Sequence, residues 1–200
     1  MAIDQRSDED LVRLYLRGDE GAFELLVRRY VPPIHRFLAR LAGDSHIAED
    51  LAQETFVKVW RHLKKFDLNK SFKTWIFTIA KNAATDFFRK KLPVAVSTIE
   101  SEEQEGFLLE HVQDERPLAP EILERQDIAR EISDALATVN ASTRTIILLH
   151  DAEGLTFQEI AEVLGEPMNT VKSRYRRGVF TLRKSLNKLN NMDEVHRKTA

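Results

Sequence analysis

Polar and basic side chains recur at helical spacing over residues 169–177, and side chains of these types bind nucleic acid rather than carry out catalysis. On a helical wheel at roughly 100° per residue, Arg176 and Arg177 share one side with an asparagine and a serine, opposite an apolar side. Such a side can hydrogen-bond base edges in a major groove while flanking cations contact phosphates. We predict a surface that reads duplex DNA; the alternative is a solvated amphipathic helix. Its members are Asn169, Thr170, Lys172, Ser173, Arg174, Arg176 and Arg177.

A short helix and a tight turn precede this surface. Thr156 and Glu159 form a capping-box pattern at the start of the first helix, and Gly165 stands where that helix must end. Pro167 suits the turn or the first position of a second helix, which we expect over about residues 169–189. The pattern predicts a helix-turn-helix, the motif that places its second helix in a major groove.

A second polar, partly cationic surface is expected on the loop of residues 69–73 and on a helix over residues 72–91. Ile76, Ile79 and Phe87 fall on one side of this helix, and the polar residues fall on the other. Cations on the backbone and pockets or rings around unstacked bases could hold single-stranded nucleic acid. The alternative is a solvated polar face. The loop residues are Asn69, Lys70, Ser71, Phe72 and Lys73, and the helix residues are Lys81, Asn82, Thr85 and Arg89.

The helix expected over residues 46–63 carries an unusual polar side, because apolar side chains stand among acids on it. A hydrophobic centre with a polar rim is how protein interfaces are built, so we predict a partner surface here. The alternative is that Trp60 turns inward and the acids are merely solvated. The predicted surface comprises Asp50, Gln53, Glu54, Val57 and Trp60.

No catalytic or metal-binding constellation is evident. His150, Asp151 and Glu153 are close in sequence but lack metal-ligand spacing, so a structural or solvated role is expected for them. The chain has no cysteine, which excludes disulfides, thiolate metal sites and cysteine redox switches. We expect no catalytic residue, metal, cofactor or small-molecule substrate.

Composition describes an ordinary globular chain of 200 residues, with 42% hydrophobic and 31% charged residues and a net charge of −2. That net charge hides an uneven distribution, since nine acids and one Arg lie between Pro93 and Glu124 and offset the basic segments. Prolines and a SEEQE run make this stretch a flexible acidic linker. No apolar run approaches the roughly twenty residues of a membrane span, so we expect a cytosolic protein without membrane insertion.

Helical periodicity without strand alternation predicts an all-α protein. Besides the helix-turn-helix, helices are expected over residues 8–17, 19–41, 46–63, 72–91, 121–139 and 142–152. Pro32 and Pro33 should bend or split the second of these, because each lacks an amide donor. Two small helical domains are expected, joined by the acidic linker. The expected ranges are 1–92 and 124–190 for the domains, 93–123 for the linker and 191–200 for a polar tail.

Two separated blocks resemble one protein family. Region 2 of the extracytoplasmic-function group of bacterial sigma factors is similar to EDLAQETFVKVWRHLKKFDLNKSFKTWIFTIAKNAATDFFRKK (Glu49–Lys91). Their region 4 is similar to residues 128–189, centred on GLTFQEIAEVLGEPMNTVKSRYRRG. The resemblance implies a bacterial, cytoplasmic specificity subunit of RNA polymerase that has no active site, recognises −35 and −10 promoter elements and helps to open the promoter.

The resemblance also implies roles for the three surfaces. Residues 50–60 match the part of region 2 that docks on the clamp helices of the polymerase largest subunit. The loop and the helix after it, with Trp75 added, match the part that melts the −10 element and captures a flipped base. Residues 169–177 match the helix that reads the −35 duplex. The implied partners are core RNA polymerase, including the flap of its second-largest subunit, promoter DNA and an anti-sigma factor.

Three residues depart from the family pattern. Asn169 stands where Gly is usual, and Gly178 stands where Ala is common. Phe180 falls on the outward side of the second helix, where a polar residue is expected; contact with the polymerase or a regulator would account for it. An alternative function is a stand-alone helix-turn-helix regulator whose N-terminal half senses a ligand or dimerises. A helical enzyme would need a pocket with convergent titratable groups.

Overall fold

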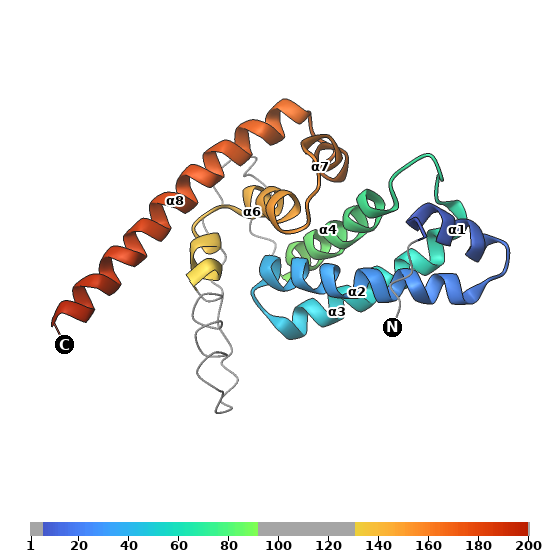
Figure 1. Cartoon of the computed structure of the whole chain (residues 1–200), viewed down its shortest axis with the longest axis horizontal. Coiled ribbons are helices and arrows are strands. Elements are labelled where there is room, and N and C mark those ends of the chain that lie inside the picture. The colour runs from blue at the N-terminus through green and yellow to red at the C-terminus, as the bar shows by residue number, and fades with distance from the viewer. Residues whose placement is uncertain (1–5, 92–130, 200) are drawn as a thin grey trace.

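The structure, a computed structural model, describes residues 6–91 and 131–199, with side chains described for residues 6–90 and 131–187. Every regular element in these ranges is helical (Figure 1), which confirms the predicted all-α class. The expected acidic linker, residues 93–123, lies outside the described residues. None of the helices within the described ranges is long and apolar enough to span a membrane.

The N-terminal half contains four helices and one short 3-10 turn. They are α1 (Asp8–Leu16), α2 (Glu20–Ala42), α3 (Ser45–His62), η1 (Leu63–Lys65) and α4 (Phe72–Lys91). Side chains cap two of the helix starts: Ser7 Oγ accepts from the Asp10 amide at α1, and Asp44 accepts from two amides at α3. Such caps satisfy amides that have no partner inside the helix. α2 packs against α1, α3 and α4.

The prolines of α2 do not split it. The helix is continuous from Glu20 to Ala42 with Pro32 and Pro33 inside it, so of the expected bend or split, the split does not occur. Pro32 lies on the exposed side, where water can hydrogen-bond carbonyls that have lost an amide partner. The buried stripe continues beyond the prolines through Phe37, and burial of this stripe outweighs the loss of two helical bonds.

The C-terminal half contains the elements of the predicted helix-turn-helix. A helical segment over residues 131–137 is the described part of the helix expected over 121–139. It is followed by α6 (Ala141–Ile147), the π-helical turn η2 (Leu148–Ala152), α7 (Phe157–Leu164) and α8 (Met168–Thr199). α8 runs ten residues beyond the predicted end near residue 189. No Gly or Pro stands in that stretch to end it.

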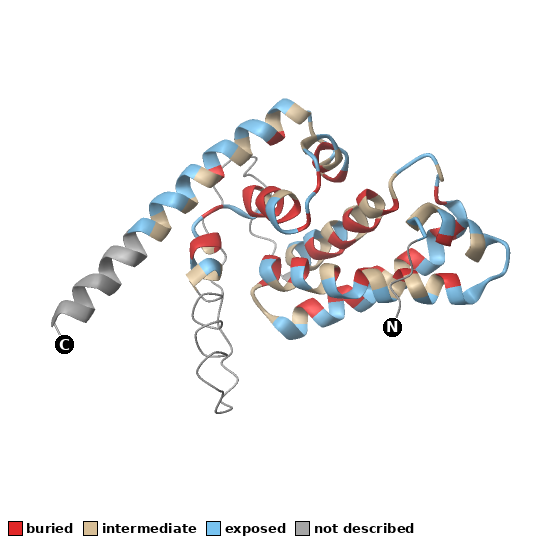
Figure 2. Ribbon diagram, viewed as in Figure 1, coloured by how far each residue is buried: buried red, intermediate tan, exposed pale blue. Residues whose placement is uncertain are grey.

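The two halves share one hydrophobic core. α7 packs against α4 on one side and α8 on the other, while η2 and α6 contact α2. Figure 2 shows the buried residues on the facing sides of these helices, with the exposed residues of α8 and α3 turned outward. The C-terminal half is therefore held against α2 and α4 rather than standing apart from them.

Candidate nucleic-acid and protein interfaces

The turn between α7 and α8 is built as the sequence predicts. Thr156 and Glu159 form a reciprocal capping box, in which the Glu159 amide donates to Thr156 Oγ1 at 3.3 Å and the Thr156 amide donates to Glu159 Oε2 at 2.8 Å. Gly165 ends α7 with φ of 68°, in the left-handed region that favours glycine. α7 then buries Ile160 and Val163. These features confirm the helix-turn-helix.

α8 rests on α6 by one side only. Val171 is fully buried, and Gly178 lies so close to α6 that a Cβ atom there would be 2.3 Å from Thr143 Cγ2 and 2.9 Å from Ile147 Cδ1. The glycine found where Ala is common therefore allows a close helix–helix approach. This contact fixes the rotation of α8, and the opposite side of the helix faces outward.

Most of the residues predicted to read the −35 duplex lie on that outward side. Thr170 and Arg174 are partly buried, and the others are exposed: Asn169, Lys172, Ser173, Arg176 and Arg177. The Arg174 guanidinium turns back to the helix-turn-helix, where Nη1 lies 2.8 Å from both carboxylate oxygens of Glu166 and 3.1 Å from Ser142 Oγ. Arg174 thus braces the turn, a role that the wheel did not reveal.

An aromatic cluster joins α8 to η2 and α7. His150 stacks on Phe157 with ring centroids 4.3 Å apart, and Tyr175 lies edge-on to both rings. The Tyr175 hydroxyl donates to Asp151 Oδ1 at 2.7 Å; burial and this hydrogen bond raise the pKa of Tyr175 to about 12. His150 and Asp151 therefore have structural roles, as predicted. No group of three potential metal ligands occurs among the described residues.

The loop before α4 is held in shape by its own side chains. Asp67 Oδ1 accepts from both the amide and the side-chain Nδ2 of Asn69, each at 3.0 Å. Asn69 and Lys70 are exposed, and Ser71 is half-buried. Phe72 is only 1% exposed, so it cannot touch a base in this conformation, contrary to the sequence-based expectation.

Phe72 instead belongs to an aromatic cluster at the start of α4. Its ring lies 5.3 Å from Tyr30, 5.7 Å from Phe66 and 5.7 Å from Trp75. Its amide donates to Glu9 Oε1 at 3.1 Å. This packing anchors the loop and holds Trp75 half-buried at its edge. The cluster joins residues far apart in sequence, which helical periodicity alone does not bring together.

The polar side of α4 is partly accessible. Asn82, Thr85 and Arg89 are exposed and Lys81 is half-buried. At the other end of the helix, Lys73 Nζ donates to the backbone carbonyl of Glu153 in the C-terminal half. The predicted nucleic-acid residues of α4 thus lie on one helix, and Lys73 at its start also contacts Glu153, the residue that follows η2.

The predicted partner surface on α3 is exposed throughout, including the acids Asp50 and Glu54. Val57 is 45% and Trp60 57% exposed, so the alternative in which Trp60 turns inward is wrong. Glu54 forms an ion pair with Lys58 at 2.6 Å. Two large apolar side chains thus stand in water among charged ones, as at the centre of an unoccupied protein interface.

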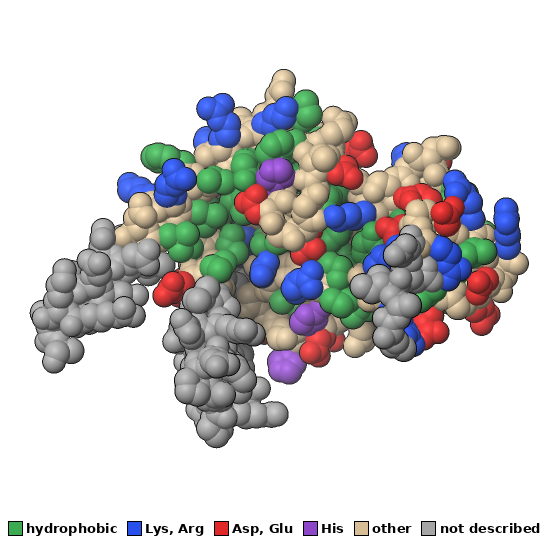
Figure 3. Space-filling view, in the orientation of Figure 1, with side chains coloured by type: hydrophobic (Ala, Val, Ile, Leu, Met, Phe, Trp, Pro, Cys, Tyr) green, Lys and Arg blue, Asp and Glu red, His purple; other side chains and the backbone are tan. Residues whose placement is uncertain are grey.

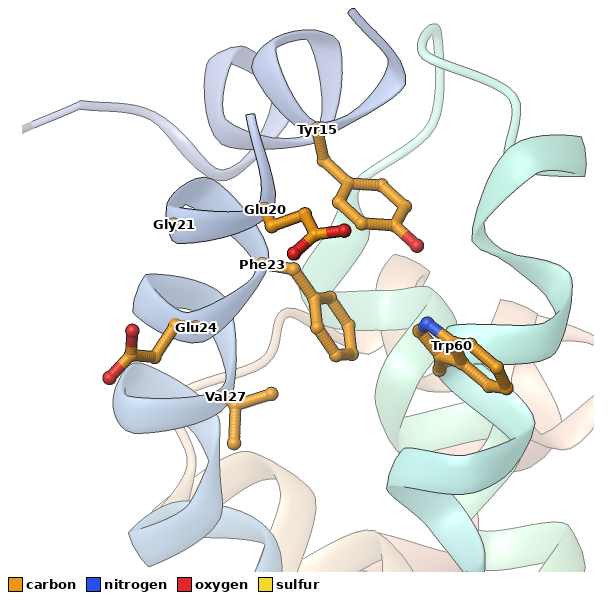
Figure 4. A pocket seen from close by; sticks show the side chains of 7 residues that line it. All are labelled: Tyr15, Glu20, Gly21, Phe23, Glu24, Val27 and Trp60. Carbon is orange, nitrogen blue, oxygen red and sulfur yellow. The ribbon is translucent and has the colours of Figure 1, made fainter. Parts of the chain in front are cut away.

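A pocket of about 530 Å³ adjoins Trp60 and lies between α1, α2 and α3. Figure 4 shows Phe23 and Val27 from α2 facing Trp60 across it, with Tyr15 above. Glu20 and Glu24 of α2 also line it. The sequence did not predict this pocket, because the helical wheel of one segment does not show where two helices diverge.

Cations gather along α8 in the space-filling view (Figure 3). The exposed basic residues of this helix with described side chains are Lys172, Arg176, Arg177, Arg183 and Lys184. The net charge of −2 therefore coexists with a local basic stripe, which is the electrostatic footprint of a polyanion-binding surface.

Comparison with known proteins shows the family of this chain. Sigma-70 region 2 matches residues 26–92, and sigma-70 region 4 matches residues 129–181. The ECF RNA polymerase sigma factor SigW of Bacillus subtilis is 33% identical over 174 residues, covering 86% of this chain and 93% of that protein. The chain belongs to the extracytoplasmic-function sigma factors. The RNA polymerase sigma-H factor of Pseudomonas aeruginosa is 32% identical over 92% of this sigma factor and 94% of its own length.

Solved structures resemble this sigma factor over most of its length. CnrH, in complex with the cytosolic domain of CnrY, matches with a TM-score of 0.66 and 23% identity over 94% of this chain and 99% of that one, which shows the fold. The sigma factor RpoE of Bartonella quintana, in complex with the anti-sigma factor NepR, matches with a TM-score of 0.62 and 25% identity over 82% of this chain and 96% of that one.

The family matches cover the candidate surfaces. α3, the loop and α4 lie within the region 2 match, while α6, α7 and α8 as far as residue 181 lie within the region 4 match. The function of this sigma factor is promoter-directed initiation of transcription. Members of this family are non-catalytic subunits of RNA polymerase.

Proposed function

We propose that this protein binds core RNA polymerase through α3, reads a −35 element with α8 and captures the opened −10 strand with the loop and α4. The observation that carries the proposal is that all three sets of residues are largely exposed on different helices of one core. Each contact can then form without displacing the others. The protein would act in the bacterial cytoplasm as a specificity subunit with no catalysis of its own.

The α3 surface suits a protein partner more than DNA. Asp50 and Glu54 would repel phosphates. Val57 and Trp60 expose apolar surface, and its removal from water by a partner is favourable. A ring of polar groups around buried aromatic and aliphatic anchors is the anatomy of a protein interface. The clamp helices of the polymerase largest subunit are the proposed partner, with the flap of the second-largest subunit contacting the C-terminal half.

The α8 and α4 surfaces suit the two states of promoter DNA. An exposed basic helix after a tight turn fits a duplex major groove. Opening the −10 element costs a few kcal/mol for each unstacked base. The half-buried Trp75 and the exposed Asn69, Lys70 and Asn82 supply ring, amide and cation contacts for a base held out of the stack.

An anti-sigma factor is a further proposed partner. The RpoE structure that matches this chain is a complex with the anti-sigma factor NepR. The same exposed apolar side chains on α3 that would meet the polymerase could also be covered by such a regulator.

Run-off transcription tests the proposal. Purified core polymerase is assayed with and without the protein on a pool of promoter fragments from its host, and start sites are sequenced. We expect specific transcripts only when the protein is present. A stand-alone regulator would give no transcripts and would bind a palindromic duplex without polymerase.

A charge reversal tests the α3 contact in the same assay. Asp50→Arg with Glu54→Arg should abolish holoenzyme formation, measured by gel filtration with core polymerase, while the helical circular dichroism stays unchanged. The matched control reverses two exposed acids of the N-terminal half that lie outside α3, Asp10→Arg with Asp19→Arg, and should assemble normally. Normal assembly of the α3 variant would remove the clamp assignment.

A further inference from the structure

Phe180 has the largest exposed fraction, 73%, of the exposed large hydrophobic residues in the described part of the chain. A single apolar residue at a protein surface is common and needs no explanation in itself. Its position on α8 and its neighbours therefore decide whether it has a role.

Phe180 continues the outward stripe of α8. Asn169, Ser173, Arg176 and Phe180 follow one another at spacings of four, three and four residues, which places them on one side of a helix. All four are exposed, whereas Gly178 faces α6 on the other side. The ring therefore points in the same direction as the residues proposed to read the −35 duplex.

Cations surround the ring. Arg176 and Arg177 precede it by one helical turn, and Arg183 and Lys184 follow it by one turn; all four are exposed. No ion pair joins any of them to an acid in the part of the chain that the structure describes. The matching partner must be strongly anionic and must also offer an apolar group. Duplex DNA has both, since its phosphates flank a major groove into which the thymine C5 methyl group projects.

The helical rise puts the ring within reach of the same groove. At 1.5 Å per residue, Phe180 lies about 6 Å along the axis from Arg176 and about 16 Å from Asn169. The major groove is about 12 Å wide. Where α8 runs along the groove, the distance of about 6 Å between Arg176 and Phe180 corresponds to about two base-pair steps of about 3.4 Å, so the ring reaches a base pair about two steps beyond the Arg176 contact.

We propose that Phe180 contacts the C5 methyl group of one thymine at the edge of the −35 element and selects a T·A pair there. The proposal rests on the proposed function of α8 and adds a specificity contact to it. An aromatic ring packs on a methyl group without a hydrogen bond, so this position would be read by apolar contact alone.

Deoxyuridine substitution isolates the methyl group, because uracil differs from thymine only by its absence. Holoenzyme containing the full chain is bound to promoter fragments mapped by run-off transcription, with each −35 thymine replaced singly by deoxyuridine. The wild-type protein should lose about fourfold in affinity at one thymine, the effect of one buried methyl group. Phe180→Ala should bind the unmodified promoter about fourfold more weakly and show no further loss with deoxyuridine there.

A matched control truncates another exposed apolar residue of the same half. Ile132 is 44% exposed, and Ile132→Ala should retain the full deoxyuridine effect. An unchanged deoxyuridine effect in Phe180→Ala overturns the proposal, as does a defect of that variant confined to assembly with core polymerase or with an anti-sigma factor. If wild-type holoenzyme does not distinguish a scrambled −35 element from the native one, the proposed function of α8 itself is wrong.

Discussion

Three arginines of α8 have different surroundings and should therefore behave differently. Arg176 and Arg177 are exposed, whereas the Arg174 side chain is 27% exposed and paired with Glu166. Arg176→Ala or Arg177→Ala should weaken binding to the −35 duplex by about 1 to 3 kcal/mol and lower the salt slope by about 0.9 for each lost phosphate contact. Their urea midpoints should match wild type. Filter binding over a salt series measures the first effect.

Arg174→Ala provides the contrast. Loss of its contacts to Glu166 and Ser142 should lower the free energy of unfolding by about 1 kcal/mol, visible as a lower urea midpoint. Equal midpoints for the Arg174 and Arg176 variants would contradict the bracing role. Unchanged −35 selectivity in both Arg176→Ala and Arg177→Ala would remove them from the reading surface.

The sequence predicted the exposure of a single residue correctly only where the position of that residue on one helix determines it. The wheel placed Arg176 and Trp60 on outward sides, and both are exposed. It could not place Arg174 against Glu166 or Phe72 among aromatic rings, because these contacts depend on how separate segments meet. The roles of the exposed residues in binding stay predictions.

At the scale of elements, the contact between α6 and α8 gives a prediction that opposes helix propensity. Ala is favoured over Gly inside a helix by about 1 kcal/mol. At Gly178 an added Cβ would lie 2.3 Å from Thr143 Cγ2, a methyl on a stiff β-branched side chain. Gly178→Ala should therefore destabilise the protein by about 1 kcal/mol net, because overpacking costs about 1 to 3 kcal/mol.

Urea unfolding of Gly178→Ala measures this balance. A companion variant, Gly178→Ala with Thr143→Ser, removes the clashing methyl and should recover most of the loss. A Gly178→Ala protein more stable than wild type would show that α6 and α8 separate at little cost.

Helix positions were predicted better than helix ends. Local signals such as the Thr156 capping box and Gly165 stop α7 where expected. Pro32 and Pro33 did not split α2, since the tertiary packing of the helix outweighs a local defect. α8 ends later than predicted because the end was placed where the apolar stripe fades, and a helix can continue without one. The pocket beside Trp60 is lined by residues of three helices, so the pattern of a single helix could not predict it.

At the scale of the whole molecule, Glu153 lies where the two halves meet. Its side chain is 4% exposed, Oε1 has no hydrogen-bond partner among the described residues, and Oε2 is 4.0 Å from Arg36. Burial raises the pKa of Glu153 above its usual value of 4.5, although Arg36, Lys73 and Arg40 oppose the shift. The folded protein therefore holds this proton more tightly than the unfolded chain does.

The contribution of Glu153 to the free energy of unfolding should fall as pH rises. The contribution of Glu153 is fully present below pH 4.5 and is lost as pH rises through the higher pKa of the folded state. Glu153→Gln cannot ionise, so its urea midpoint should rise relative to wild type between about pH 4 and pH 7. A pH-independent difference for Glu153→Gln would contradict the raised pKa.

The bond from Lys73 Nζ to the Glu153 carbonyl makes the two halves thermodynamically linked. If a phosphate of the opened −10 strand binds Lys73 in place of the Glu153 carbonyl, the C-terminal half loses one of its contacts with α4. Reciprocity then requires that whatever draws the C-terminal half away from α4 raises the affinity of Lys73 for the strand by the same factor. If engagement of the upstream element by α8 draws the C-terminal half away from α4, that engagement and capture of the melted strand are cooperative through the Lys73 ammonium group.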